Sequence, residues 1–267
     1  MEVNMEYNPE SYYKSLDRFF QGLRNFYSET QTTYERRLTN FFQPLIFRYR
    51  VAKEIKKQTD KYLASDFNLI ELIKPDENRI SDLVALLLNP KGEHGQGETF
   101  LKEFIEYLKG FLEKTENLKA LGQIDISQVS VEKEFATYEG RRIDIFVKFP
   151  GFVIGIENKP WAGERDRQLA DYNEFLQNFG NENYILIYLD GWGREATSMD
   201  EQTKEKLKQE GKFLEVSYNN FLKPWLIKCY KECEAEKVRW FLKDFVNWIE
   251  DNFKEEVENE ERKEGTD

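Results

Sequence analysis

The sequence predicts an α/β fold with a mixed central sheet flanked by helices, a helical N-terminal extension and helices towards the C-terminus. Three observations predict it. Two strand-like segments lie within 141–159, one with alternating apolar residues and one with a continuous apolar run, separated by the turn sequence Phe149-Pro150-Gly151. Apolar residues at helical spacing precede and follow these runs. The length of 267 residues allows one sizeable core, so we expect one domain with additions and no internal repeat.

Segment character divides the chain into a helical extension at 1–65, an α/β domain at 66–253 and a disordered acidic tail at 254–267. Cys229 and Cys233 are the two cysteines and lie four residues apart in a helical stretch. This favours buried free thiols over a disulfide framework or a zinc site. No apolar run approaches the length of a membrane span, and the first residues lack the features of a signal peptide. We therefore expect a cytoplasmic protein with no membrane association.

In the N-terminal extension, apolar residues recur at helical spacing from Tyr13 to Leu23 and again from Leu38 to Ile46. The pattern predicts two or three helices, and Pro44 could kink or divide the second of them. We interpret the apolar stripe as core or as a docking surface rather than a ligand site. A helical arm of this kind could also form a homodimer, and the sequence does not choose between these roles.

The next helix is expected to begin after Asp76, which follows a proline and can cap the helix N-terminus. Asn89-Pro90 ends this helix. A glycine-rich loop at 91–97 then holds the single histidine, His94. The loop is either a tight turn with a structural histidine or a segment that flanks the site with His94 or Gln96. A nucleoside triphosphate site is excluded because no Lys-Ser/Thr pair follows the glycines.

The remaining elements follow from hydrophobic period and turn signals. Strands are expected at 127–136, 141–149, 152–159, 184–189 and 213–217. Helices are expected at 99–112, 164–179, 222–230 and 238–253. The loop at 191–194 follows a strand end, where α/β sheets tend to place ligands, although its Trp192 could equally pack on the core.

Charged side chains stand at the end of the otherwise apolar strand 152–159. Glu157 and Lys159 are two residues apart and therefore share one face of it. A simple ion pair at a strand end would explain them, and Glu-x-Lys also occurs at 54–56, 210–212 and 261–263. The setting distinguishes this copy. Asp144 lies on the preceding strand, and Gln168 and Tyr172 lie four residues apart on the following helix, hence on one helical face.

This order of Asp, Glu-x-Lys and Gln-x-x-x-Tyr resembles the PD-(D/E)XK nuclease superfamily, and the last motif is similar to its exonuclease-like branch. The resemblance spans roughly 76–189 and implies a restriction-endonuclease-like core. Ile143 stands where the name-giving proline would be. The resemblance also implies that Glu77, in the first helical turn after Asp76, completes the metal ligation. Alternatively, Glu77 only favours the positive end of the helix dipole.

The residue types suit phosphodiester hydrolysis, which uses a hard divalent cation held by carboxylates, water and phosphate. We expect Mg²⁺ or Mn²⁺ bound by Asp144 and Glu157, with Glu77 and Glu134 as further candidate ligands. Lys159 would orient the nucleophile or stabilise the transition state. The candidate catalytic set is completed by two residues: Gln168 to hold a phosphate oxygen or orient the lysine, and Tyr172 to stack or donate a hydrogen bond.

The net charge of −11 argues against strong nucleic-acid binding, which depends on phosphate neutralisation. A bound cation would carry positive charge into the site. Basic residues also cluster around it: Arg141, Arg142, Lys148, Lys159, Arg165 and Arg167. We therefore expect a Mg²⁺-dependent nuclease that acts on nucleic acid, with DNA as the favoured substrate. The alternative is a non-catalytic nuclease-fold protein that acts as a binding or assembly module.

Overall fold

The computed structural model describes residues 9–64, 66–112, 115–137, 140–161, 163–180 and 182–254, with side chains from Tyr13 onwards. The chain forms two compact units, Met1–Phe67 and Asn68–Asp267. The predicted acidic tail lies, except for Lys254, outside the described residues.

The described residues of the first unit form one helix, α1, which runs from Pro9 to Leu63 over 55 residues. The expectation of two or three helices is therefore wrong. Pro44 lies inside α1 without ending it. Proline removes one backbone donor and crowds the preceding turn, at a cost of about 3 kcal/mol, whereas each residue that extends a helix adds a hydrogen bond. Large apolar side chains along α1, from Tyr13 to Leu63, are exposed within this unit.

The second unit is built on a five-stranded sheet in the order β1-β2-β3-β4-β5. The strands are β1 (Ser130–Ala136), β2 (Arg142–Phe149), β3 (Phe152–Lys159), β4 (Tyr184–Asp190) and β5 (Phe213–Ser217). The first three are antiparallel, and β3, β4 and β5 are parallel. The predicted mixed sheet is confirmed. Every residue of β3 and β4 is buried, as expected for central strands covered on both faces.

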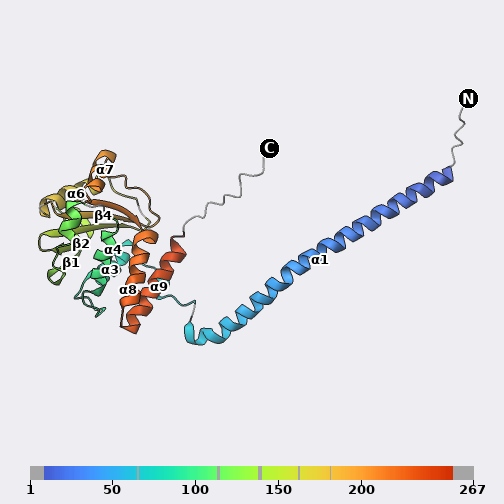
Figure 1. The fold of residues 1–267 in the computed structure, drawn as a ribbon, viewed down its shortest axis with the longest axis horizontal. Coiled ribbons are helices and arrows are strands. Elements are labelled where there is room, and N and C mark those ends of the chain that lie inside the picture. Colours follow the sequence, from blue (N-terminus) through green and yellow to red (C-terminus); the bar gives the residue numbers. More distant parts are fainter. Residues whose placement is uncertain are drawn as a thin grey trace, which may run out of the picture. The chain divides into compact units, whose positions relative to one another are not determined.

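Helices cover both faces of this sheet (Figure 1). One face packs against α3 (Glu77–Leu88), α4 (Thr99–Lys109), α8 (Lys223–Glu232) and α9 (Glu236–Asn252). The other packs against α6 (Gln168–Phe179) and α7 (Glu201–Gln209). Smaller elements are α2 (Leu69–Ile73), α5 (Glu116–Leu121), a 3₁₀ turn at Ile126–Gln128 and a π turn at Tyr218–Leu222. The α/β class predicted from the sequence is thereby confirmed.

Local polar contacts explain where two elements begin. Asp76 caps α3 as predicted, because its side chain accepts a hydrogen bond from the Arg79 N–H. Helix α6 begins at Gln168 and not at residue 164, because Arg167 adopts a left-handed conformation with φ 53°. The Glu164 carboxylate instead accepts bonds from the backbone N–H groups of Thr197 and Ser198, so it fastens a distant loop.

Helix α6 lies close to β3 because Gly155 has no side chain. A Cβ at this position would stand 2.9 Å from Leu176 Cδ1 on α6, closer than Cβ atoms come to other carbons in proteins. The backbone of Gly155 has an ordinary conformation, so the glycine serves close packing and not chain reversal. Gly155 thus leaves room for Leu176 between the helix and the strand that carry the polar residues of the cavity.

Among the described residues, no helix combines the length and the apolar character needed to cross a membrane. Cys229 and Cys233 are both buried and unpaired, as expected from their spacing.

We predict that a chain lacking residues 1–67 keeps the fold of the second unit. All buried hydrophobic residues in the described part of the chain lie between Ile70 and Phe253, so the deletion removes none of this core. Thermal unfolding followed by tryptophan fluorescence should stay cooperative, with a midpoint within about 3 °C of the full chain. All five tryptophans lie between Trp161 and Trp248, so the signal reports this unit alone. Loss of the cooperative transition would show that the second unit does not fold independently of residues 1–67.

Candidate active site

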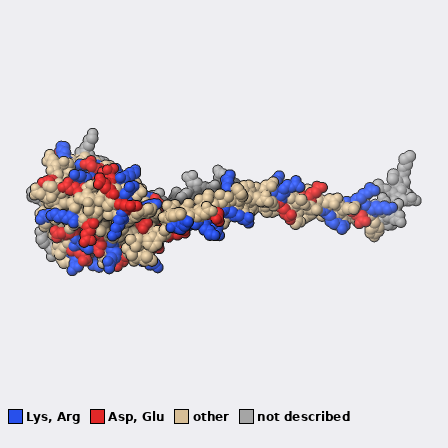
Figure 2. Space-filling model, turned by 90° about the horizontal axis from the view of Figure 1, so that it is seen from below, with Lys and Arg blue, Asp and Glu red and all other residues tan. Residues whose placement is uncertain are grey.

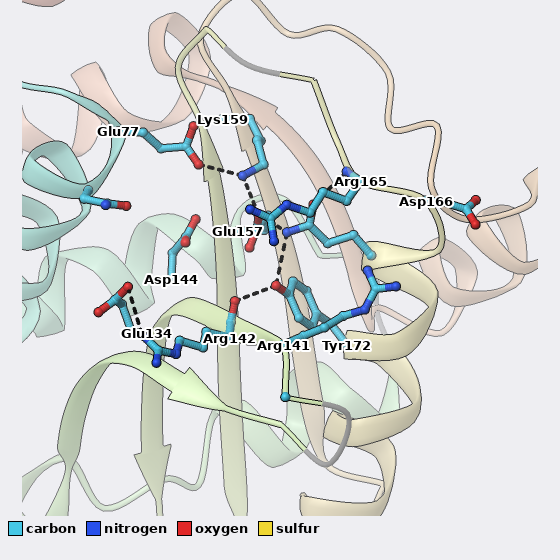
Figure 3. Close-up of a pocket in the computed structure, with 13 residues that line it drawn as sticks. Glu77, Glu134, Arg141, Arg142, Asp144, Glu157, Lys159, Arg165, Asp166 and Tyr172 are labelled. Carbon is cyan, nitrogen blue, oxygen red and sulfur yellow. Dashed lines mark hydrogen bonds and ion pairs between the residues drawn. The ribbon is translucent and has the colours of Figure 1, made fainter.

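A cavity of about 770 Å³ opens beside the ends of β2 and β3 and the start of α6 (Figure 3). Its walls are almost entirely polar and charged. The residues that line it are Glu77, Asn78, Glu134, Gly140, Arg141, Arg142, Asp144, Glu157, Lys159, Arg165, Asp166, Gln168 and Tyr172. All six candidate catalytic residues and all four candidate metal ligands expected from the sequence are among them.

Three carboxylates converge in this cavity. Asp144 and Glu157 are brought together by the antiparallel register of β2 and β3, in which Ile145 pairs with Ile156. Glu77 approaches from the first turn of α3. One oxygen from each of the three groups lies within 4.8 Å of the others. Within the described part of the chain, this is the group of acidic, histidine or cysteine side chains that could hold a metal ion.

Lys159 lies between these carboxylates. Its Nζ is 2.6 Å from Glu77 Oε1 and 2.6 Å from Glu157 Oε1, and its side chain is only 8% exposed. Burial by itself would lower the pKa of Lys159, but the neighbouring carboxylates, Glu157 first, raise it overall. The lysine is therefore an ammonium at neutral pH, held in a fixed position by two acids.

The charged forms of Asp144 and Glu157 are disfavoured by their buried surroundings. Burial, followed by the charge of Asp144, raises the pKa of Glu157 to about 8. Burial also raises the pKa of Asp144 to about 6, although the hydrogen bond from the Asn158 N–H (2.8 Å) opposes it. Glu157 Oε2 is buried without a hydrogen-bond partner, which is costly for a carboxylate oxygen.

These features fit a hard divalent cation. Oxygen ligands from two or three carboxylates are what Mg²⁺ and Mn²⁺ prefer. A cation in contact with Glu157 Oε2 would give that oxygen the partner it lacks and would offset the repulsion between Asp144 and Glu157. Because carboxylates bind metal as anions, binding would also lower the raised pKa values.

Gln168 and Tyr172 join α6 to both strands of the site. The Gln168 amide donates to Glu157 Oε1 at 2.6 Å and to the Tyr172 hydroxyl at 3.1 Å. Tyr172 in turn donates to the backbone carbonyl of Arg142 on β2. The Gln168 side-chain oxygen accepts from the Arg165 N–H at 3.0 Å. The amide therefore has partners on both sides and acts here to position Glu157.

The fourth candidate ligand, Glu134, stands apart from the other three. It lies on β1 with φ 47°, is largely exposed, and lies 3.5 Å from Arg142 in a weak ion pair. It is not part of the converging carboxylate group. The structure therefore places Glu134 on the cavity rim.

The basic residues expected near the site divide into two groups. Arg141 lines the cavity but is paired with Asp171 at 2.8 Å. Arg165 also lines it, is exposed, and forms no ion pair with any described residue. Two others lie elsewhere: Lys148 stands over the Phe179 ring and Arg167 pairs with Asp171 and Glu174.

His94 does not line the cavity. It is buried, and its ring bonds to the Asn89 carbonyl at 2.9 Å and the Gln96 N–H at 3.0 Å. Of the two interpretations left open by the sequence, the structure supports the structural histidine. Trp192 likewise packs against Phe253, with ring centroids 5.1 Å apart.

Two supporting residues were missed by the sequence reasoning. Asn158 is fully buried and bonds through its side chain to Ser81 and Tyr218, while its backbone N–H holds Asp144. Asp190 is opposite Lys159 in the parallel register and accepts three backbone N–H bonds from the loop 192–194. A polar residue within a buried strand was the available signal for both.

A family model of the PD-(D/E)XK nuclease superfamily matches residues 67–264. The matched segment contains every residue that lines the cavity. No curated protein and no solved structure matches the chain.

We predict that metal-free protein becomes less stable as pH rises from about 5 to about 8. The pKa of Glu157 is about 8 in the folded state, against an ordinary value of 4.5. The folded state therefore holds a proton that the unfolded state releases, and the resulting stabilisation is lost as pH rises through the folded pKa. Thermal melts in EDTA between pH 5 and pH 9 measure this.

Glu157→Gln should remove most of this pH dependence, and exposed Glu195→Gln should not. Millimolar Mg²⁺ should raise the melting midpoint of the wild-type protein more at pH 8 than at pH 6, because the deprotonated carboxylates bind it. Identical pH profiles for the wild-type protein and Glu157→Gln would disprove the role of this carboxyl.

We further predict that Tyr172→Phe weakens metal binding as well as the fold. The change removes the hydroxyl that accepts a hydrogen bond from the Gln168 amide and donates one to the Arg142 carbonyl, at a cost of about 1–3 kcal/mol. The Gln168 amide, which positions Glu157, then loses its link to β2. The matched control is Tyr184→Phe, which removes a hydroxyl bonded to Asn173 outside the cavity. Melting midpoints should fall in both variants, whereas calorimetric Mg²⁺ affinity should fall in Tyr172→Phe alone. Equal Mg²⁺ affinities would show that the tyrosine is only structural.

Proposed function

The chain belongs to the PD-(D/E)XK nuclease superfamily over residues 67–264, and from this premise we propose that it is a metal-dependent nuclease that hydrolyses phosphodiester bonds of nucleic acid, with DNA as the favoured substrate. One observation carries the proposal. Three carboxylates converge on one point of the cavity, one of them has a buried oxygen without a partner, and a buried lysine lies between them.

In this proposal Glu77, Asp144 and Glu157 hold the cation, which is Mg²⁺ or Mn²⁺. When bound, such an ion polarises a phosphoryl oxygen and makes a bound water more acidic. Asp144 is kept in place by the Asn158 N–H, and Glu157 by Gln168. Glu134, on the rim, is retained only as an additional ligand.

Lys159 is proposed to act on the reacting phosphate. Its ammonium is already desolvated and anchored by Glu77 and Glu157, so little reorganisation is needed when negative charge develops next to it. It can donate a hydrogen bond to the attacking water or to a phosphate oxygen. Lysine suits this position better than arginine, because a compact ammonium fits among three carboxylates where a planar guanidinium does not.

Arg165 is proposed to bind the substrate backbone. It is exposed at the cavity wall without an ion pair to any described residue, so a phosphate can pair with it without breaking an existing contact. Its backbone N–H is held by Gln168, which couples substrate binding to the Gln-x-x-x-Tyr motif. On this motif we also propose that the chain belongs to the exonuclease-like branch.

We also propose that the protein is cytoplasmic and that it forms a homodimer through the N-terminal helix.

We predict that Asp144→Ala and Glu157→Ala abolish metal-dependent cleavage and weaken metal binding, because each removes an oxygen ligand from a cation with few to spare. Lys159→Ala should keep the metal but lower the cleavage rate on the order of a hundredfold or more, by analogy with a lost transition-state donor. Lys159→Arg should not restore the rate. Cleavage of labelled single-stranded and double-stranded DNA and of RNA, in Mg²⁺ and in Mn²⁺, measures these effects.

The matched control is Lys204→Ala, which also removes a buried, ion-paired lysine but lies outside the cavity. It should lower stability and leave cleavage intact. Metal titration and thermal melts accompany each variant. Cleavage by Lys159→Ala at the wild-type rate would refute the role of the lysine. A wild-type chain that binds no metal and cuts none of the substrates would favour the binding or assembly module.

A further inference from the structure

Helix α1 contains an internal repeat, contrary to the expectation from the sequence. The pattern Leu-x-x-Phe-Phe-Gln-x-Leu-x-x-x-Tyr occurs at 16–27 and again at 38–49. Each of its six defining residues recurs 22 positions later. Gly22 in the first copy is replaced by Pro44 in the second. A repeat inside one continuous helix indicates that the same kind of contact is made at both copies.

The repeated apolar residues form one stripe. Within each copy they are separated by three, four, seven and eleven positions, so they share one face of the helix. Twenty-two residues are two eleven-residue periods, a spacing that keeps a stripe nearly straight and suits a pair of helices with a weak right-handed twist. Within the first unit these side chains are exposed, for example Phe19 at 61% and Phe41 at 63%.

The stripe is too long for the second unit to cover. Exposed large apolar residues run from Tyr13 to Leu63, about 75 Å along a helix. A domain of the size of the second unit has a radius of gyration of about 16 Å and a diameter of roughly 40 Å. A partner that matches the stripe along its length is another helix of the same length, which a second copy supplies.

We infer that α1 pairs with the α1 of a second copy in antiparallel orientation, about a two-fold axis between Thr32 and Thr33. This inference goes beyond the proposed nuclease activity and does not depend on it. The expected homodimer left the relative direction of the two α1 helices open, and the antiparallel pair specifies it.

The order of residues in the repeat favours the antiparallel orientation. About this axis, facing positions have numbers that add up to 65. Four of the five apolar positions in each copy then place a leucine against an aromatic ring: Leu16 with Tyr49, Phe20 with Leu45, Leu23 with Phe42, and Tyr27 with Leu38. At the fifth position, Phe19 faces Ile46 and Phe41 faces Arg24. A parallel pair in register would instead stack ring on ring and leucine on leucine. Alternation of large and small side chains across an interface keeps the helix separation constant.

The surface is large enough for a stable dimer. If about ten large side chains per helix lose the half of their surface that is still exposed, each helix buries on the order of 800–1,000 Å². Stable interfaces bury about 800 Å² per partner.

Charged residues are spaced along α1 between uncharged ones (Figure 2). The helix contains eleven Lys and Arg residues and six Asp and Glu residues. The charged residues lie mainly on the face away from the stripe.

The orientation can be measured on the full chain by spin labels. Two labels at Arg50→Cys should lie about 50–60 Å apart in an antiparallel pair, because position 50 faces position 15. Two labels at Thr32→Cys, next to the axis, should lie within about 30 Å. A parallel pair would give short distances at both positions. Cys229 and Cys233 are buried, and the unsubstituted chain is the labelling control.

A charge-swap experiment tests the same register without labels. Leu23→Lys alone and Phe42→Glu alone should each convert the dimer to monomer in analytical ultracentrifugation, because each places two charges in an apolar interface. The double variant should recover dimer at least partly, since position 23 faces position 42 only in the antiparallel pair. Tryptophan melts should be unchanged in all three, because every tryptophan lies outside α1.

A wild-type chain that sediments as a monomer at micromolar concentration would overturn the inference. So would short distances at both labelled positions, or a double variant that is no better than the single ones. A monomer that floats with phosphatidylglycerol vesicles would assign the stripe to a lipid surface instead. None of these outcomes bears on nuclease activity, so failure of this inference and failure of the proposed function are separable.

Discussion

The candidate site depends on one desolvated carboxylate. Glu157 lies on a central strand with no exposed residue, where one of its oxygens receives Gln168 and Lys159 and the other receives nothing. The fold supplies everything else around this carboxyl group: a neighbouring strand brings Asp144, a helix start brings Glu77, and a second helix brings the amide. A sheet covered on both faces creates the low polarity that raises the pKa of Glu157. The same burial excludes water that would otherwise satisfy it.

Charge is distributed unevenly along the chain. The whole molecule has a net charge of −11, while α1 contains five more basic than acidic residues, so the second unit is more acidic than the total indicates. Most arginines near the cavity are also neutralised by Asp171, Glu134 or Glu174. If the chain binds nucleic acid as proposed, attraction of the polyanion to this unit would depend on a few local groups and on the proposed cation, so its binding should respond only modestly to ionic strength.

The sequence predicted structure best where neighbouring residues determine it. The alternation in β2 and β3, the cap at Asp76 and the spacing of Gln168 and Tyr172 could all be read directly, and the structure gathers these residues in one cavity. Contacts between distant segments could not be read. The Glu164 carboxylate accepts hydrogen bonds from Thr197 and Ser198, more than thirty residues away in the sequence. Glu164 therefore lies outside α6, which begins only at Gln168. The continuity of α1 through Pro44 was not predicted, because it depends on the long stretches of helix on either side, whose hydrogen bonds outweigh the local cost of the proline.

Gly155 has an effect beyond packing. It precedes Glu157 by two residues on the same strand face, and Leu176, which occupies the space of its missing side chain, follows Gln168 by about two helical turns. The Leu176 side chain therefore links position 155 to the helix that carries the Gln168 amide. A larger residue at position 155 would press on Leu176, and any movement of α6 that follows would change the hydrogen bond that keeps Glu157 acidic. The acidity of the site can thus be adjusted by a residue that carries no polar atom in its side chain and never meets a substrate.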